Sequence, residues 1–163
     1  MLNKTIKLFS IFTTILILVT NLSIEPASAM GEKTFKTQHK KKEVPDEFSK
    51  FKIPEINSST AYKLWNGKKA VFVDALDEES YRAQHIPGAI NLPASDPETN
   101  WHEFLDIEKD DIIITYSSSK KCEDGKNLAK YLKHKGYTQV YYYKPGLKGW
   151  TYNLLPIESE NDY

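Results

Sequence analysis

Short apolar runs alternate with helix-like stretches along residues 53–158. The runs at 71–73, 112–116 and 140–143 are rich in β-branched and aromatic residues, a composition that favours buried strands, and 89–92 is a further short strand. Amphipathic patterns between the runs predict helices at 58–65, 78–83, 101–105 and 123–135. This alternation predicts an α/β domain built on a parallel sheet.

Polar and small residues mark where these elements begin and end. The sequence Ser58-Ser59-Thr60 is expected to cap the first helix, which ends at Asn66-Gly67. Gly136 follows the helix at 123–135 and suits its C-terminus. We expect Pro145-Gly146 to form a turn after the last strand.

The N-terminal segment has the pattern of a signal peptide. Lys4 and Lys7 precede an apolar run at 8–19, and Ala27-Ser28-Ala29 supplies the small residues of a cleavage site. We therefore expect residues 1–29 to be a signal peptide and the chain to be exported, either periplasmic or secreted, with no stable membrane anchor after cleavage. The alternative is an uncleaved anchor, although the run is shorter than the roughly 20 residues of a spanning helix.

Both ends of the exported chain are polar. Residues 30–52 hold many lysines among few apolar residues, which predicts a flexible basic linker, with a basic docking arm as the alternative. Residues 159–163 are expected to be an acidic, solvated tail. The α/β domain is thus expected to span 53–158.

Composition excludes several classes of protein. The 163 residues hold 22 Lys and Arg against 22 Asp and Glu, so the chain lacks the net positive charge that would favour binding to nucleic acid. A hydrophobic fraction of 40% is enough for a packed core. The 4 His and single Cys show no paired spacing, and we expect neither a metal site nor a cofactor. Cys122 is the only thiol, so no intramolecular disulfide can form.

The segment after the strand at 112–116 is the candidate site. A strand that leads through a short loop into a helix brings several backbone N–H groups together, and such a loop binds anions. The expected ligand-binding residues are those of this loop: Ser117, Ser118, Ser119, Lys120, Lys121 and Cys122.

A second segment, His85-Ile86-Pro87-Gly88-Ala89-Ile90-Asn91-Leu92-Pro93, follows a strand that ends at Asp74. It resembles the signature segment of rhodanese domains, and the likeness continues in order through 111–116, 128–132, 136–137 and 146–150. The resemblance implies a five-stranded parallel sheet with helices on both faces. It also implies an active loop at the carboxyl end of the fourth strand.

Rhodanese-type sulfurtransferases use a loop cysteine that takes sulfur from a donor such as thiosulfate and passes it on from a persulfide. In this chain Ser117 occupies the position of that nucleophile. A serine hydroxyl stays protonated without a base and forms no stable sulfur adduct. We therefore expect an exported rhodanese-like module without ordinary thiosulfate sulfurtransferase activity, which binds a small anion or a protein partner.

Cys122 leaves an alternative open. It lies near the helix start beside Lys120 and Lys121, where a thiol is activated, so the chain could be a sulfurtransferase or persulfide carrier that uses Cys122. Against this, Cys122 falls at helical spacing with Gly125, Leu128, Ala129 and Leu132, and so could be an inert residue of the face that packs on the sheet. Both hypotheses stand at this point.

Two further polar residues favour structural roles. His85 beside Ile-Pro-Gly is expected to hold a turn by hydrogen bonds rather than to shuttle protons. Asp74 is expected to support local structure, because that is its usual part in the family. The arginine that usually follows two residues later is Leu76 here. A phosphatase is set aside because the loop has neither Cys nor Arg at the matching positions.

Overall fold

The computed structural model describes residues 46–160. The predicted signal peptide, most of the predicted basic linker and residues 161–163 of the predicted tail lie outside the described residues. The described residues fall within one compact unit, residues 41–163. The sheet and both hydrophobic cores of the described residues lie within this unit.

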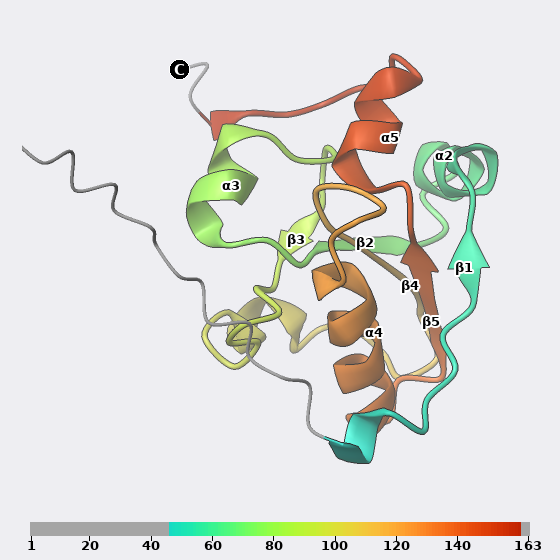
Figure 1. Ribbon diagram of the computed structural model, residues 1–163, viewed down its shortest axis with the longest axis vertical. Helices are drawn as coiled ribbons and strands as arrows, with labels where there is room; N and C mark the ends of the chain where they lie inside the picture. Colours follow the sequence, from blue (N-terminus) through green and yellow to red (C-terminus); the bar gives the residue numbers. More distant parts are fainter. Residues whose placement is uncertain (1–45, 161–163) are drawn as a thin grey trace, which may run out of the picture. The chain divides into compact units, whose positions relative to one another are not determined.

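The sheet has five parallel strands in the order β1-β5-β4-β2-β3 (Figure 1). The long strands at the centre carry the apolar runs, and the two edge strands have two residues each. The strands are β1 Glu55–Ile56, β2 Val71–Asp74, β3 Ile90–Asn91, β4 Ile112–Tyr116 and β5 Gln139–Tyr143. The predicted five-stranded parallel sheet is confirmed.

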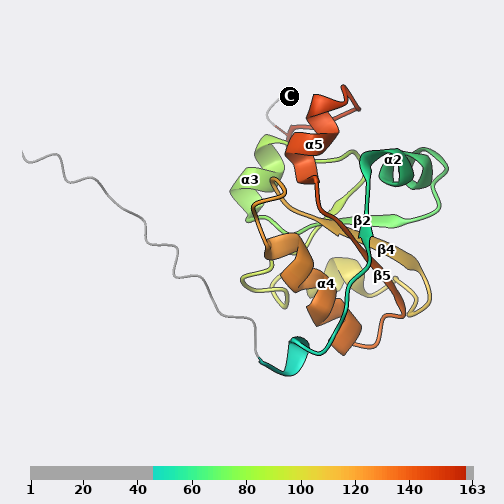
Figure 2. The ribbon, with the colours of Figure 1, turned by 45° about the vertical axis from the view of Figure 1, so that its right-hand side comes forward.

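Helices connect the strands and cover both faces of the sheet. The α-helices are α2 Ser58–Asn66, α3 Glu78–Ala83, α4 Asp124–His134 and α5 Gly146–Tyr152, and the 3-10 helices are η1 Asp46–Phe48 and η2 Trp101–Phe104. Figure 2 shows α4 on one side of the strands and α2 and α5 on the other.

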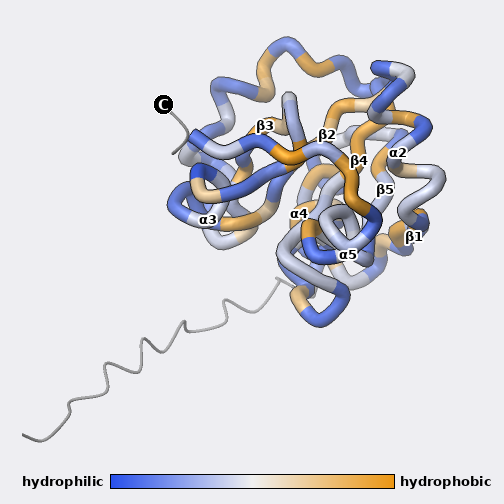
Figure 3. Tube along the Cα trace, turned by 90° about the horizontal axis from the view of Figure 1, so that it is seen from above, coloured by the Kyte–Doolittle hydropathy of each residue, from blue (hydrophilic) through white to orange (hydrophobic). Residues whose placement is uncertain are grey.

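Two hydrophobic cores lie on opposite faces because side chains along a strand alternate in direction. Val73 and Ile113 face α4 and pack with Leu128 and Leu132. Their neighbours in sequence, among them Phe72 and Ile114, face the other way and pack with α2, α3 and α5, where Trp150 is fully buried. Figure 3 shows the hydrophobic positions of β2 and β4 at the centre of the domain.

The start of α2 differs from the prediction. Asn57, not the serine pair, is the N-cap residue, and its side chain accepts a hydrogen bond from Thr60 N at 2.9 Å. The hydroxyl of Ser58 instead lies 2.9 Å from the Tyr143 hydroxyl. The Ser58 side chain, which the local pattern assigned to the helix cap, therefore makes a tertiary contact instead.

The end of the domain also differs from the prediction. Pro145 is the N-cap of α5 and Gly146 its first residue, so the expected turn is the beginning of a helix. Strand β1 was not predicted, because its two residues show no alternation and it exists through its pairing with β5.

The folded part of the chain extends beyond the predicted boundaries. Phe48 lies in the segment predicted as linker, yet it is buried and its ring contacts those of Tyr131 and His134. At the other end, Glu160 from the predicted tail lies 2.7 Å from the guanidinium of Arg82. None of the helices within residues 46–160 is long and apolar enough to cross a bilayer.

Candidate functional site

The loop of residues 117–122 joins the end of β4 to α4, at the carboxyl edge of the sheet. β4 is flanked by β2 and β5, so the loop leaves from the middle of the sheet. Figure 1 shows the loop beside the start of α5. In open α/β sheets this edge is where ligands bind.

Ser117 is the first residue of the loop and is completely buried, with an exposed fraction of 0%. Its hydroxyl donates a hydrogen bond to the backbone carbonyl of Cys122 at 3.1 Å, which bridges the two ends of the loop. No carboxylate or imidazole accepts a hydrogen bond from this hydroxyl within residues 46–160. The side chain therefore closes the loop and has no base to activate it.

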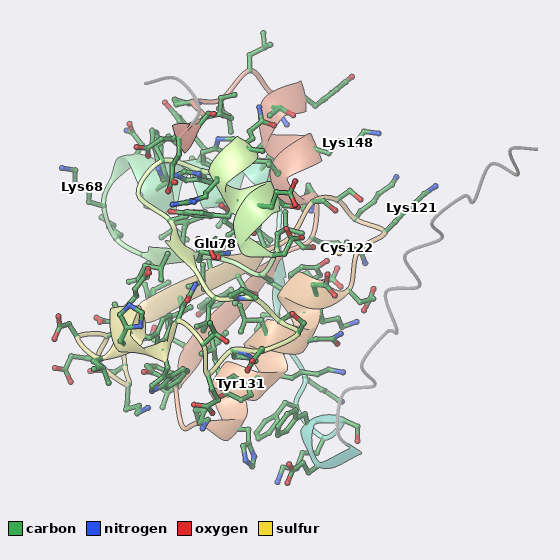
Figure 4. The ribbon with its side chains drawn as sticks, turned by 90° about the vertical axis from the view of Figure 1, so that its left-hand side faces the viewer. Lys68, Glu78, Lys121, Cys122, Tyr131 and Lys148 are labelled. Atoms are coloured by element: carbon green, nitrogen blue, oxygen red, sulfur yellow. The ribbon has the colours of Figure 1, made fainter. Side chains whose placement is uncertain are left out.

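Cys122 ends the loop, two residues before α4, and is half-buried. Its amide donates to Ser119 O at 2.9 Å, and its thiol donates to Asp124 Oδ2 at 3.1 Å. Figure 4 shows it on the same side of the domain as Lys121 and Lys148. Cys122 belongs to neither hydrophobic core, whereas Gly125, Leu128, Ala129 and Leu132 are buried as expected for the inner face of α4.

Tyr142 on β5 also holds the loop in place by a hydrogen bond. Its hydroxyl donates to Cys122 O at 3.0 Å, so this carbonyl accepts from both Tyr142 and Ser117. Burial, together with the negative charge of Glu123, raises the pKa of Tyr142 to about 12. The phenol is therefore a hydrogen-bond donor at neutral pH and not a general base.

The start of α5 is packed directly on the loop. Leu147 N and Lys148 N donate to the carbonyls of Ser117 and Ser118, both at 2.8 Å. Gly146 has a φ of 63°, and a Cβ added to it would lie 2.4 Å from Ser117 O. Only glycine fits this close approach. The loop is thus held between α5 and β5.

The middle of the loop faces solvent. Ser118, Lys120 and Lys121 are exposed and Ser119 is partly exposed. The amides of residues 118–121 donate no hydrogen bond within the described part of the chain. The N-cap of α4, Glu123, makes no side-chain capping hydrogen bond. Unpaired amides beside a helix N-terminus favour the approach of an anion.

Asp74 lies at the end of β2, beside Tyr116 of β4, and is fully buried. Its Oδ1 accepts from Leu76 N at 2.9 Å, whereas Oδ2 has no partner at hydrogen-bonding geometry among the described residues. Burial raises the pKa of Asp74 from 3.8 to about 6, although the Leu76 amide, the Tyr116 hydroxyl and His85 each lower it. Within the described residues, Asp74 makes hydrogen bonds to Leu76, Asn91 and Leu92 and none to the 117–122 loop.

His85 is buried and holds a turn, in agreement with its expected role. Its Nδ1 lies 2.8 Å from Tyr81 O, and its ring stacks on the Tyr81 ring with 3.9 Å between the centroids. Its backbone pairs with Glu158 in an antiparallel bridge, and its Nε2 lies 3.6 Å from Glu158 Oε2. These contacts fasten the C-terminal segment to the turn at 85–88.

No group of three or more His, Cys, Asp or Glu side chains within residues 46–160 is arranged to hold a metal ion. The residues that the sequence reasoning missed are Tyr142, Gly146 and Asp124. Gly146 after a proline was visible as a backbone signal, but it was interpreted as a turn. The contacts of Tyr142 and Asp124 depend on the folded loop.

The comparisons with known proteins agree with this fold. The family model of the rhodanese-like domain matches residues 58–153. YibN of Escherichia coli strain K12, an uncharacterized protein, is 33% identical over 107 residues, which cover 65% of this chain and 73% of YibN. An uncharacterized protein of Buchnera aphidicola is 35% identical over 109 residues, 67% of this chain and 71% of that protein.

Among solved structures, the BH2092 protein of Bacillus halodurans is similar with a TM-score of 0.58 and 24% identity, over 66% of this chain and 77% of that one. A thiosulfate sulfurtransferase of Pseudomonas aeruginosa has a TM-score of 0.55 and 19% identity, over 66% of this chain and 20% of that one. These structures share the fold. By its sequence match and its five-stranded parallel sheet, the chain belongs to the rhodanese-like domain family.

Proposed function

We propose that this chain is an exported rhodanese-like module that binds a small anion or a protein partner at the 117–122 loop and does not carry out ordinary thiosulfate sulfurtransfer. The observation that carries the proposal is the environment of Ser117. Its side chain is fully buried, and its hydroxyl donates a hydrogen bond to Cys122 O at 3.1 Å.

Sulfur transfer needs a soft nucleophile that is ionised near neutral pH. Ser117 offers a hard oxygen whose proton is engaged by a carbonyl. The neighbouring hydroxyl belongs to Tyr142, whose pKa of about 12 leaves it protonated at neutral pH. With neither a thiol nor a base at this position, a sulfur-carrying intermediate cannot form there.

The loop offers hydrogen-bond donors and positive charge to an anion, even though a serine occupies the position of the family's nucleophile. Four consecutive amides, 118–121, have no hydrogen-bond partner within the described residues. Lys120 and Lys121 are exposed beside them and add positive charge. The contacts of the loop with α5 and β5 hold these donors in place before a ligand arrives, which lowers the entropic cost of binding.

A second candidate function is favoured by the position of Cys122. The thiol is half-buried at the end of the loop and outside the hydrophobic cores, so a sulfur donor can approach it. In this function the Cys122 sulfur would attack the outer sulfur of thiosulfate, forming an S–S bond while sulfite leaves with the electron pair of the broken bond. Asp124 Oδ2 opposes this, because it would lie 3.1 Å from a negatively charged sulfur.

Intact mass spectrometry after incubation with thiosulfate separates the two functions. We expect the domain of residues 41–163 to keep its mass, because Ser117 cannot hold sulfur and Asp124 repels an anionic sulfur at Cys122. The control is the Cys122→Ala variant. A labile adduct of one sulfur atom that the variant lacks would refute the inactive-module proposal and establish Cys122 as a persulfide carrier.

Replacement of Ser117 by cysteine tests whether only the nucleophile is missing. In a Cys122→Ala background, we expect Ser117→Cys to gain cyanide-dependent formation of thiocyanate from thiosulfate, because the loop amides can stabilise a thiolate. The matched control is Ser118→Cys, whose thiol would be exposed on the next residue. If Ser117→Cys forms no more thiocyanate than Ser118→Cys, the loop no longer has a competent geometry.

A further inference from the structure

The segment that follows α5 concentrates exposed apolar side chains. Three of the five exposed large hydrophobic residues within 46–160 lie between positions 152 and 157. Tyr152 has 87% of its surface exposed, Leu154 93% and Ile157 45%. Scattered single exposures are ordinary, whereas a local group of this kind marks an interaction surface.

Leu154 is held in a backbone conformation that does not suit it. Its φ is 55°, in the left-handed region, where it ends α5 by donating from its amide to Thr151 O at 2.9 Å. Glycine is the usual residue at such a helix end, because a Cβ is strained there. Neither backbone geometry nor burial therefore accounts for a leucine at this position.

Unpaired positive charge lies next to these apolar side chains. Lys148 is one helical turn before Tyr152 on α5, so the two share a face of the helix. Lys148 N is bonded to Ser118 O, which places the loop lysines, Lys120 and Lys121, beside it. Figure 4 shows Lys121 and Lys148 projecting to the same side. None of these three lysines forms an ion pair in the described part of the chain.

The acidic side chains nearest in sequence to these lysines are engaged elsewhere. Glu123 lies 3.8 Å from Lys126 Nζ, and Asp124 accepts from the Cys122 thiol. In the C-terminal segment, Glu158 and Glu160 face His85 and Arg82. The surface made by Lys120, Lys121, Lys148, Tyr152 and Leu154 is therefore apolar at its end and cationic along its side.

We propose that this surface binds an anionic lipid bilayer, with Leu154 and Tyr152 inserted at the interface and the three lysines on the headgroups. A protruding leucine gains free energy in the acyl region, and tyrosine is favoured at the headgroup level. Lysines near an anionic leaflet are attracted to it.

A protein partner fits the same residues less well. Leucine is under-represented among the residues that dominate protein–protein binding, which lie in well-packed pockets of the interface. Here the leucine stands out from the end of a helix with nearly all of its surface free. The N-terminal sequence, which predicts export, also brings the chain to a membrane.

Sedimentation of the 41–163 domain with vesicles tests the proposal. We expect binding to mixed phosphatidylglycerol and phosphatidylcholine vesicles, weak binding to pure phosphatidylcholine, and release by added salt. Leu154→Gly should weaken binding about tenfold while raising the midpoint of thermal unfolding, because glycine relieves the strain. Lys148→Gln should weaken binding about fivefold.

Matched variants elsewhere on the domain act as controls. Leu105 is another exposed leucine, with 70% of its surface free, and Lys68 points away from Lys121 and Lys148 in Figure 4. Leu105→Ala and Lys68→Gln should bind vesicles like the unsubstituted domain. The proposal is overturned if the domain does not sediment with anionic vesicles, or if the Leu154→Gly variant binds them as tightly as the unsubstituted domain. A soluble protein partner on this surface would give the first of these results.

Discussion

Replacing Gly146 with alanine is expected to lower the free energy of unfolding by at least about 3 kcal/mol. Two effects add. The residue has a φ of 63°, which strains any side chain, and the new Cβ would lie 2.4 Å from Ser117 O and 2.8 Å from Ser119 N. These are backbone atoms of the candidate loop, so the strain can be relieved only by moving the loop or α5. Urea denaturation measures the loss.

Gly88 provides the matched control for this substitution. Its φ is 75°, but a Cβ added there would meet nothing within 4 Å. Gly88→Ala should therefore show only the backbone cost of about 1 kcal/mol. An equal loss in both variants would mean that the contact of α5 with the loop is looser than its hydrogen bonds indicate. A larger loss for Gly146→Ala, with weakened anion binding, would show that α5 holds the loop.

Asp74 is expected to make the domain less stable as the pH rises from about 4 to about 6. Burial raises the pKa of Asp74 from 3.8 to about 6, so the folded state binds a proton that the unfolded state has lost in this interval. The free energy of unfolding therefore falls with rising pH there, by about 3 kcal/mol in all. Asp74→Asn should remove this loss and stabilise the domain at pH 7.5 by about 1 to 3 kcal/mol.

The asparagine retains an Oδ1 that can accept from Leu76 N, as Asp74 does at 2.9 Å. Denaturation of both proteins across the pH range gives the contribution of Asp74 as the difference between the two curves. Asp96→Asn, at an exposed position, controls for the loss of one negative charge. Equal pH dependence in the Asp74→Asn variant and the unsubstituted domain would contradict the prediction.

Much of the fold could be predicted because its central elements carry their signals locally. The helix Glu78–Ala83 and the strand Ile112–Tyr116 have the predicted bounds. The inner face of α4 is also the predicted one, since helical spacing alone brings Leu128 and Leu132 onto one side. Such patterns are strong because a buried strand or an amphipathic helix must repeat its apolar positions.

The elements that the sequence did not predict depend on distant partners. β1 is a strand only because Glu55 and Ile56 pair with Tyr142 and Tyr143 of β5. α5 begins at a Pro-Gly pair, a local turn signal, because the first amides of the helix find the carbonyls of Ser117 and Ser118. Short segments of this kind have too little local preference to determine their own conformation.

The sequence by itself determined the order of strand, loop and helix around Ser117. Together with the resemblance to rhodanese domains, this order predicts a serine at the position of the family's nucleophile. Only the tertiary structure decided how the loop uses it. Ser117 and Tyr142 both donate hydrogen bonds to the carbonyl of Cys122, and Asp124 accepts a hydrogen bond from the Cys122 thiol. Hydrogen bonds between residues from separate elements depend on distances that no spacing along the chain specifies.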